Sequence, residues 1–219
     1  MSDLLPQHLP VAGVLQDIVL ASRNGAVVVT APPGSGKTML VPAAVLDDLP
    51  STQKVVLIQP RRMAARAIAR WIAQRRRSRV GKEVGYQVRF DSQMSRDTRL
   101  LVVTTGILLR RFLDDVALED VGAVVVDEFH ERTIEMDLVL GMLVRIRQTL
   151  RPDLRVVVMS ATLAAEPVAG TFLTRRVAVS FARTGFGVSL PLHGCIYGPN
   201  NGFGHEMERK LGSALAIGE

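Results

Sequence analysis

The sequence lacks the features that would mark a secreted or membrane-spanning protein. Its single cysteine, Cys195, can form neither a disulfide within the chain nor a metal cluster. No run approaches the roughly 18 consecutive apolar residues that a membrane-spanning helix needs. The first residues, MSDLLPQHLP, contain no basic segment followed by an apolar stretch, as a secretory signal would. We therefore expect a cytoplasmic protein with no membrane contact.

The composition excludes a chain that is mostly disordered. Hydrophobic residues make up 47% of the 219 residues and charged residues 22%, with both signs of charge present. This length fits one large domain, or one domain with an appendage, and is too short for a machine of two full lobes.

The positive charge is concentrated in one segment. Residues 60–79, PRRMAARAIARWIAQRRRSR, contain eight arginines and no acid, and because the whole chain carries +6, the remainder sums to −2. Such a block is typical of a polyanion-binding surface, although a solvated helix face is the ordinary alternative. The motifs around it must decide between the two.

Short β-branched apolar runs alternate with helical patterns along the chain. The runs are nearly continuous in hydrophobicity, which predicts strands that are buried on both faces. Alternation with helices predicts an α/β fold with a parallel sheet and right-handed crossovers. The predicted strands are 26–30, 54–59, 99–104, 123–127 and 155–160, and the predicted helices are 37–49, 63–77, 107–113 and 136–150.

A distinctive polar cluster follows each of the five predicted strands. The clusters read APPGSGKT, QPRR, TTG, DEFHER and SAT, in chain order. Because ligands of parallel α/β sheets bind outside the carboxyl ends of the strands, these clusters are expected to form one site.

The first cluster matches a phosphate-binding loop, although Ala31 stands where the first glycine usually lies. Gly34 and Gly36 allow the backbone N–H groups to face phosphate oxygens, and the following helix directs its positive end at them. Lys37 is expected to reach the β- and γ-phosphates and Thr38 to bind Mg²⁺. A glycine-rich turn without a ligand is the alternative. The complete predicted nucleotide-binding set is Ala31, Pro32, Pro33, Gly34, Ser35, Gly36, Lys37 and Thr38.

The fourth cluster supplies two adjacent acids at the end of a buried strand. Asp127 suits the Mg²⁺ shell, and Glu128 is placed to orient or deprotonate an attacking water. Buried acids need a counter-charge, which Mg²⁺ would provide. A solvated Asp-Glu turn is the alternative, but the phosphate loop on the same chain disfavours it. His130 alone would be weak evidence of function.

Together, APPGSGKT, QPRRMAAR, GYQVRFD, TTGILLRR, DEFHER and SAT resemble the motor core of the DEAH-box ATP-dependent RNA helicases of superfamily two. The resemblance covers about residues 9–180 and is strongest to the bacterial HrpB-type subgroup. It implies a RecA-like domain that binds and hydrolyses ATP with Mg²⁺, followed in complete members by a second RecA-like domain. The single motifs are individually unspecific; their order carries the resemblance.

The resemblance also implies roles for further residues. His130 would couple the nucleotide site to the second domain, and Ser160 and Thr162 would link hydrolysis to strand separation. The residues implied in gripping single-stranded RNA, with DNA possible, are Arg61, Arg62, Thr104, Thr105 and Gly106. Arg62 follows a strand exit directly, and guanidinium groups bind phosphate without reading bases, which supports this role over a structural one.

Three interpretations remain open along the arginine block and after it. Arg75–Arg77 and Arg79 fit a solvated face better than an RNA contact. Trp71 or Arg70 would stack on the nucleotide base, unless Trp71 packs between helix and sheet. The segment Gly85–Asp91 predicts an extra strand with Tyr86, Val88 and Phe90 towards the core, with Arg89 contacting nucleic acid or an acid of the domain.

The sequence predicts a boundary near residue 180. Residues 181–219 contain 8 of the 18 glycines and no arginine-finger motif of a second RecA-like domain. This tail is either a truncated or frame-shifted remnant or a loosely ordered extension. We expect residues 1–180 to be the motor domain, with weak binding of nucleotide and RNA and slow hydrolysis by this chain alone. Another phosphate-loop NTPase and a catalytically inactive binding module are the alternatives.

Overall fold

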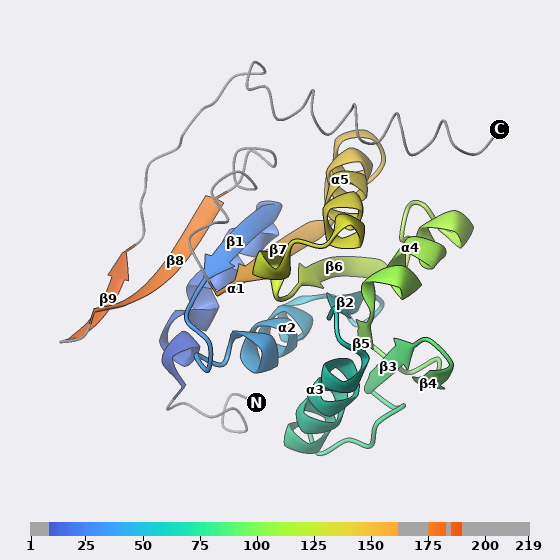
Figure 1. Cartoon of the computed structure of the whole chain (residues 1–219), viewed down its shortest axis with the longest axis horizontal. Coiled ribbons are helices and arrows are strands. Elements are labelled where there is room, and N and C mark those ends of the chain that lie inside the picture. Colours follow the sequence, from blue (N-terminus) through green and yellow to red (C-terminus); the bar gives the residue numbers. More distant parts are fainter. Residues whose placement is uncertain (1–8, 162–174, 183–184, 190–219) are drawn as a thin grey trace.

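A mostly parallel sheet forms the centre of the molecule (Figure 1). The computed structural model describes residues 9–161, 175–182 and 185–189. The sheet order is β4-β3-β5-β2-β6-β7-β1-β8-β9. The strands are β1 (Ala26–Thr30), β2 (Lys54–Ile58), β3 (Val84–Val88), β4 (Asp91–Gln93), β5 (Leu100–Val103), β6 (Val121–Val126), β7 (Arg155–Ser160), β8 (Arg175–Ala182) and β9 (Gly185–Ser189).

All neighbouring strands are parallel except at the two ends of the sheet. There, β3 pairs with β4 and β8 pairs with β9 in antiparallel hairpins. The five predicted strands are therefore confirmed as the parallel centre, with boundaries shifted by up to two residues. Parallel pairing brings the carboxyl ends of β1, β2, β5, β6 and β7 to one edge of the sheet, as expected.

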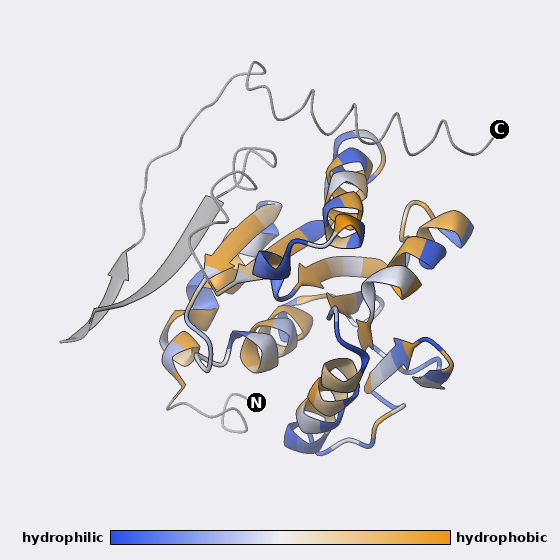
Figure 2. Cartoon of the chain, viewed as in Figure 1, coloured by the Kyte–Doolittle hydropathy of each residue, from blue (hydrophilic) through white to orange (hydrophobic). Residues whose placement is uncertain are grey.

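The continuous apolar runs form two hydrophobic cores, one on each face of the sheet. Successive side chains of a strand point to opposite faces, so Val27 and Val29 join one core and Ala26 and Val28 join the other. Figure 2 shows the central strands as mainly hydrophobic. Burial on both faces explains why these strands do not alternate between polar and apolar residues.

Helices cover both faces. The first core includes residues of α1, α2 and α3, whereas α4 and α5 pack on the second. The predicted helices are confirmed with small changes of boundary. The 3-10 helix η2 and helix α1, which precede the first strand, had not been predicted. The helices are η2 (Pro10–Val14), α1 (Leu15–Arg23), α2 (Lys37–Asp48), α3 (Arg62–Arg75), α4 (Thr105–Asp114), η3 (Phe129–Glu131) and α5 (Ile134–Thr149).

The extra strand is confirmed as β3, but one of its predicted core residues is wrong. Tyr86 and Val88 are buried, whereas Phe90 is 89% exposed. The chain leaves the strand at Val88 and turns back into β4, and Phe90 lies in that turn with φ of 67°. The period-2 pattern therefore continued in the sequence for two residues beyond the strand itself.

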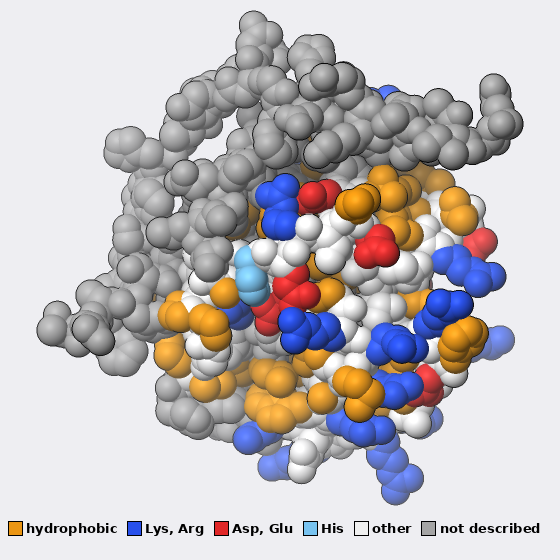
Figure 3. Space-filling model, in the orientation of Figure 1, with side chains coloured by type: hydrophobic (Ala, Val, Ile, Leu, Met, Phe, Trp, Pro, Cys, Tyr) orange, Lys and Arg blue, Asp and Glu red, His pale blue; other side chains and the backbone are white. Residues whose placement is uncertain are grey.

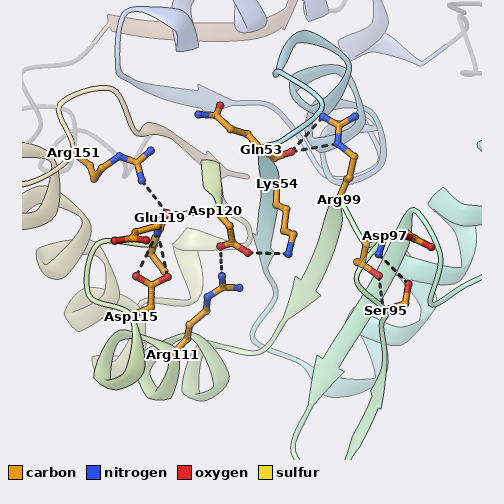
Figure 4. Close-up of polar contacts among 12 residues, drawn as sticks. Gln53, Lys54, Ser95, Asp97, Arg99, Arg111, Asp115, Glu119, Asp120 and Arg151 are labelled. Carbon is orange, nitrogen blue, oxygen red and sulfur yellow. Dashed lines mark hydrogen bonds and ion pairs between the residues drawn. The ribbon is translucent and has the colours of Figure 1, made fainter.

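Ion pairs and hydrogen bonds fasten the opposite, amino-terminal edge of the sheet (Figure 4). Asp120, directly before β6, pairs with Lys54 at 2.8 Å and also with Arg111 of α4. Arg99 donates to the main-chain oxygens of Pro50 (2.8 Å) and Gln53 (3.3 Å). These contacts tie loops to strand starts, and they leave the carboxyl-terminal edge as the place for a site.

The predicted boundary at residue 180 stays a prediction. Strand β8 continues to Ala182 and pairs with β9, which lies within the proposed tail. The remainder of the tail lies outside the described residues. Within the described ranges, no helix is long and apolar enough to cross a membrane.

Candidate nucleotide and magnesium site

The loop after β1 has a left-handed backbone at two of its glycines, as expected for a phosphate-binding loop. Gly34 and Gly36 have φ of 76° and 91°, a region that L side chains rarely adopt. A Cβ atom on Gly36 would also lie 2.8 Å from Cδ1 of Leu9. The amide of Val11 in η2 donates to the carbonyl of Ser35 at 3.1 Å. The segment before α1 therefore supports the loop from outside.

The Lys37 ammonium lies inside this loop. Nζ donates to the carbonyl oxygens of Ala31 at 2.8 Å and Pro32 at 3.3 Å, and the residue is only 5% exposed. Helix α2 begins at Lys37, so its free amide groups and the ammonium face the same place. This is an arrangement that can bind an anion such as a phosphate.

Asp127 joins the end of β6 to the start of α2. Its Oδ2 accepts hydrogen bonds from Thr38 Oγ1 at 2.7 Å and from Gln59 Nε2 at 3.0 Å. Its Oδ1 is buried and has no hydrogen-bond partner among the described residues. A buried carboxylate oxygen without a donor, next to a threonine hydroxyl, matches the hard oxygen ligands that Mg²⁺ prefers.

Burial changes the acidity of Asp127. The side chain is fully buried, and loss of solvation, together with the neighbouring Glu128 carboxylate, raises its pKa to about 6, although the hydrogen bond from Thr38 opposes the change. A divalent cation would favour the charged form and would remove this penalty. The electrostatics of the site therefore fit a bound metal ion.

Glu128 and His130 connect the acids to the segment after β7. His130 Nδ1 lies 3.4 Å from Glu128 Oε2, and the amide of Ala161 donates to the same nitrogen at 3.4 Å. Glu128 lies directly before the 3-10 helix η3, as its N-cap residue, with φ of 51°. Ser160 is buried at the end of β7, and its carbonyl accepts from the amide of Ala31 in the phosphate loop. Thr162 lies outside the described residues.

The predicted RNA residues lie at neighbouring strand ends but differ in exposure. Arg61 and Arg62 are exposed where α3 begins. Thr104 and Gly106 are accessible at the start of α4, whereas Thr105 is buried at 5% exposure. Strands β2 and β5 are adjacent and parallel, so the two segments share one edge. Figure 3 shows acidic side chains and a histidine together near the centre of one face, with basic side chains gathered beside them.

The arginine block is not one uniform solvated face. The expectation for Arg75–Arg77 and Arg79 is wrong for Arg76, which pairs with Glu83 at 2.7 Å and with Asp47 at 2.8 Å. These hydrogen bonds outweigh burial and raise the pKa of its guanidinium. Arg66 similarly pairs with Asp91 at 2.8 Å. Part of the block therefore holds the fold together.

Trp71 is partly buried and packs against the core on the α3 face of the sheet, and the Arg75 guanidinium lies 5.1 Å from the centre of its ring. Arg70 is exposed. The structure gives Trp71 a packing role, and stacking of either residue on a base stays a prediction.

Sequence reasoning missed two side chains of this site. Gln59 was part of the QPRR cluster but received no role, although it contacts Asp127. Glu131 of DEFHER has no role among the predicted residues, and its Oε1 lies 2.9 Å from Arg61 Nη2. The position of Gln59 at a strand exit was the only signal available for it.

This fold and this edge define a RecA-like phosphate-loop nucleotide-binding domain, in which a strand-loop-helix and a strand-end acid pair face each other. The family model for the DEAD/DEAH box helicases matches residues 14–169. The chain therefore belongs to the DEAD/DEAH box helicase family.

The relatives agree with this assignment. The chain is 42% identical over 171 residues to a probable ATP-dependent RNA helicase, DHR2, of Saccharomyces cerevisiae, covering 75% of this chain and 23% of the relative. It is 41% identical over 156 residues to the ATP-dependent RNA helicase HrpB of Escherichia coli, covering 71% and 19%. The crystal structure of Escherichia coli DEAH/RHA helicase HrpB matches with a TM-score of 0.70 and 39% identity, over 74% of this chain and 21% of that one. The chain thus spans about a fifth of these relatives.

Proposed function

We propose that this chain is the first motor domain of an ATP-dependent RNA helicase, and that it binds Mg²⁺-ATP and single-stranded RNA and hydrolyses ATP to ADP and phosphate. Residues 1–180 would form the motor domain and residues 181–219 a separate tail. The observation that carries the proposal is the hydrogen bond from Thr38 to Oδ2 of Asp127, which joins the phosphate loop to the acid pair and leaves the buried Oδ1 of Asp127 without a donor among the described residues.

The residues of the site have distinct parts in this reaction. The loop amides and Lys37 bind and orient the phosphates, and Thr38 and Asp127 hold Mg²⁺. When bound, Mg²⁺ offsets the negative charge that develops on the phosphoryl oxygens. The Glu128 carboxylate accepts a proton from the attacking water, and His130, whose Nδ1 accepts the amide of Ala161, lies beside Glu128 and connects it to the segment after β7.

RNA would bind across the ends of β2 and β5, where the exposed Arg61 and Arg62 supply positive charge beside Thr104, Thr105 and Gly106. Such contacts to phosphate bind without sequence preference, so DNA is a possible second ligand. His130, Ser160 and Thr162 would transmit hydrolysis to a second RecA-like domain. Because such a second domain supplies the arginine fingers in the family, we expect the 219 residues by themselves to hydrolyse ATP slowly and not to unwind RNA. The cytoplasmic location stays a prediction.

The test is ATP turnover by the chain with and without single-stranded RNA. Glu128→Gln should lower the rate about 10²-fold or more while nucleotide still binds, because general-base catalysis contributes at least this much. Lys37→Ala should weaken nucleotide binding itself. Glu135→Gln and Lys82→Ala are matched controls, because both residues are exposed.

Two outcomes would contradict the proposal. Nucleotide and RNA binding with no turnover, and no effect of Glu128→Gln, would indicate an inactive binding module. Turnover that RNA does not affect, and that persists in Arg61→Ala with Arg62→Ala, would indicate another kind of phosphate-loop NTPase.

A further inference from the structure

We propose that Gln59 is a positioning residue that keeps the Asp127 carboxylate in the orientation needed to bind Mg²⁺. The inference rests on the proposed function, in which Asp127 is part of the metal site. It assigns a role to a side chain of the QPRR segment that does not itself reach the nucleotide loop.

The two oxygens of Asp127 have different surroundings. Oδ2 accepts both hydrogen bonds, from Thr38 at 2.7 Å and from the Gln59 amide at 3.0 Å. Oδ1 is buried with no donor among the described residues. The two donors on Oδ2 fix the angle of the carboxylate plane. Because a half-turn of a carboxylate only exchanges two equivalent oxygens, one oxygen always faces the donors and the other, here Oδ1, is available to a cation.

Gln59 is itself fixed in place. It is 3% exposed, and its main-chain N–H donates to the carbonyl of Val103 at 2.9 Å. The amide of Asp127 donates to the carbonyl of Ile58, the residue before Gln59, at 3.1 Å. The ends of β2 and β6 are thus held in register. The side chain that meets Asp127 starts from a backbone that has little freedom to move.

The chemistry of an amide suits this task. A lysine or arginine here would neutralise Asp127 and would compete with the cation, whereas the neutral amide donates a hydrogen bond and leaves the negative charge for Mg²⁺. Thr38 alone is a weaker restraint, because its hydroxyl is also a predicted metal ligand. Groups that orient metal ligands in this way typically contribute about 10–100-fold to metal affinity.

A purely structural role makes a different prediction. If Gln59 only satisfies a buried carboxylate, its loss would disturb the whole site and would weaken nucleotide binding whether or not Mg²⁺ is present. If Gln59 orients Asp127, its loss weakens nucleotide binding only when Mg²⁺ is present.

The experiment measures binding of a fluorescent, non-hydrolysable ATP analogue to the whole chain, in EDTA and across a Mg²⁺ titration. Gln59→Met keeps the length of the side chain and removes the donor. Gln59→Asn keeps the amide but is one methylene too short to reach Asp127, so it serves if the methionine variant does not fold. Gln74→Met, on the exposed side of α3, is the matched control.

We expect both Gln59 variants to need at least about 10-fold more Mg²⁺ than the wild type for half-maximal binding of the analogue. Their affinity for the analogue in EDTA should equal that of the wild type. Wild-type Mg²⁺ dependence in both variants, or an equal loss of affinity with and without Mg²⁺, would overturn the inference alone. A wild-type chain that binds no nucleotide in either condition would overturn the proposed function and, with it, this inference.

Discussion

Arg61 Nη2 lies 2.9 Å from Glu131 Oε1, so a predicted RNA-binding side chain is paired with the segment that carries the acid pair. Arg61 is 73% exposed at its side chain, and Glu131 is 25% exposed. An RNA phosphate that binds Arg61 must therefore compete with Glu131, and its binding would release the end of η3.

This pairing predicts that Glu131→Gln binds single-stranded RNA more tightly. An exposed ion pair contributes about 0.2–1 kcal/mol, so the expected gain in affinity reaches about 5-fold at most. Fluorescence anisotropy with a labelled oligouridine would measure it. Glu135→Gln removes an exposed carboxylate that forms no ion pair with the part of the chain that the structure describes, and it should change affinity less. Equal gains in both variants would mean that only net charge matters.

The raised pKa of Asp127 predicts an unusual pH dependence of stability. Because the pKa of about 6 lies above the ordinary value of 3.8, folding favours the protonated acid. The resulting contribution of protonated Asp127 to the free energy of unfolding is fully present below pH 3.8 and is lost as the pH rises through 6. At pH 8 without metal, Asp127→Asn should therefore be more stable than wild type by about 3 kcal/mol, and the difference should shrink towards pH 4.

Urea unfolding at several pH values, compared between the two proteins, measures this difference directly. Addition of Mg²⁺ at pH 8 should stabilise the wild type more than Asp127→Asn. Parallel pH profiles of the two proteins would show that Asp127 is not the group responsible.

The phosphate loop predicts a position-specific effect of alanine. Gly36 has φ of 91°, and a Cβ atom there would meet Leu9 at 2.8 Å. Gly36→Ala should destabilise the fold by at least about 1–2 kcal/mol through the left-handed backbone alone, and should weaken nucleotide binding. Gly13→Ala is the control, because Gly13 has open space around it and no positive φ. Thermal unfolding and nucleotide titration are the measurements. Equal behaviour of both variants would contradict the strained-loop argument.

The packing of Trp71 predicts a loss of stability rather than of nucleotide binding. Removal of a fully buried tryptophan costs about 3–5 kcal/mol, and Trp71 is only partly buried, so we expect about 2 kcal/mol for Trp71→Ala. Nucleotide affinity should stay at the wild-type value. Chemical denaturation and a binding titration would be run on the same sample. A clear loss of nucleotide affinity with little loss of stability would instead favour base stacking.

Much of the fold could be predicted because it depends on local patterns. Continuous apolar runs such as Val121–Val126 can be satisfied only by burial on both faces, which requires helices on both sides. The turn at Phe90 could not be predicted, since the residue that ends a strand is chosen by the hairpin that follows. Helix α1 is not predicted, because it precedes the first strand and is therefore not marked by the alternation of strands and helices.

Part of the candidate site could also be predicted from the sequence, and part could not. The phosphate loop and the acid pair are contiguous in sequence, and each type of residue has a chemical reason to stand there. The contacts of Gln59 with Asp127 and of Arg61 with Glu131 join residues that are 68 and 70 positions apart. No local pattern contains such pairs.

The sequence by itself determined the class of fold, the family resemblance and the chemistry available at each strand end, because these depend on residue type and on spacing along the chain. Only the tertiary structure decided which side chains meet. It determined that Thr38 and Gln59 share one oxygen of Asp127, that Arg76 belongs to the fold and that Phe90 faces outward. The physical reason is that strand order and register, set by packing of the whole sheet, bring distant strand ends together.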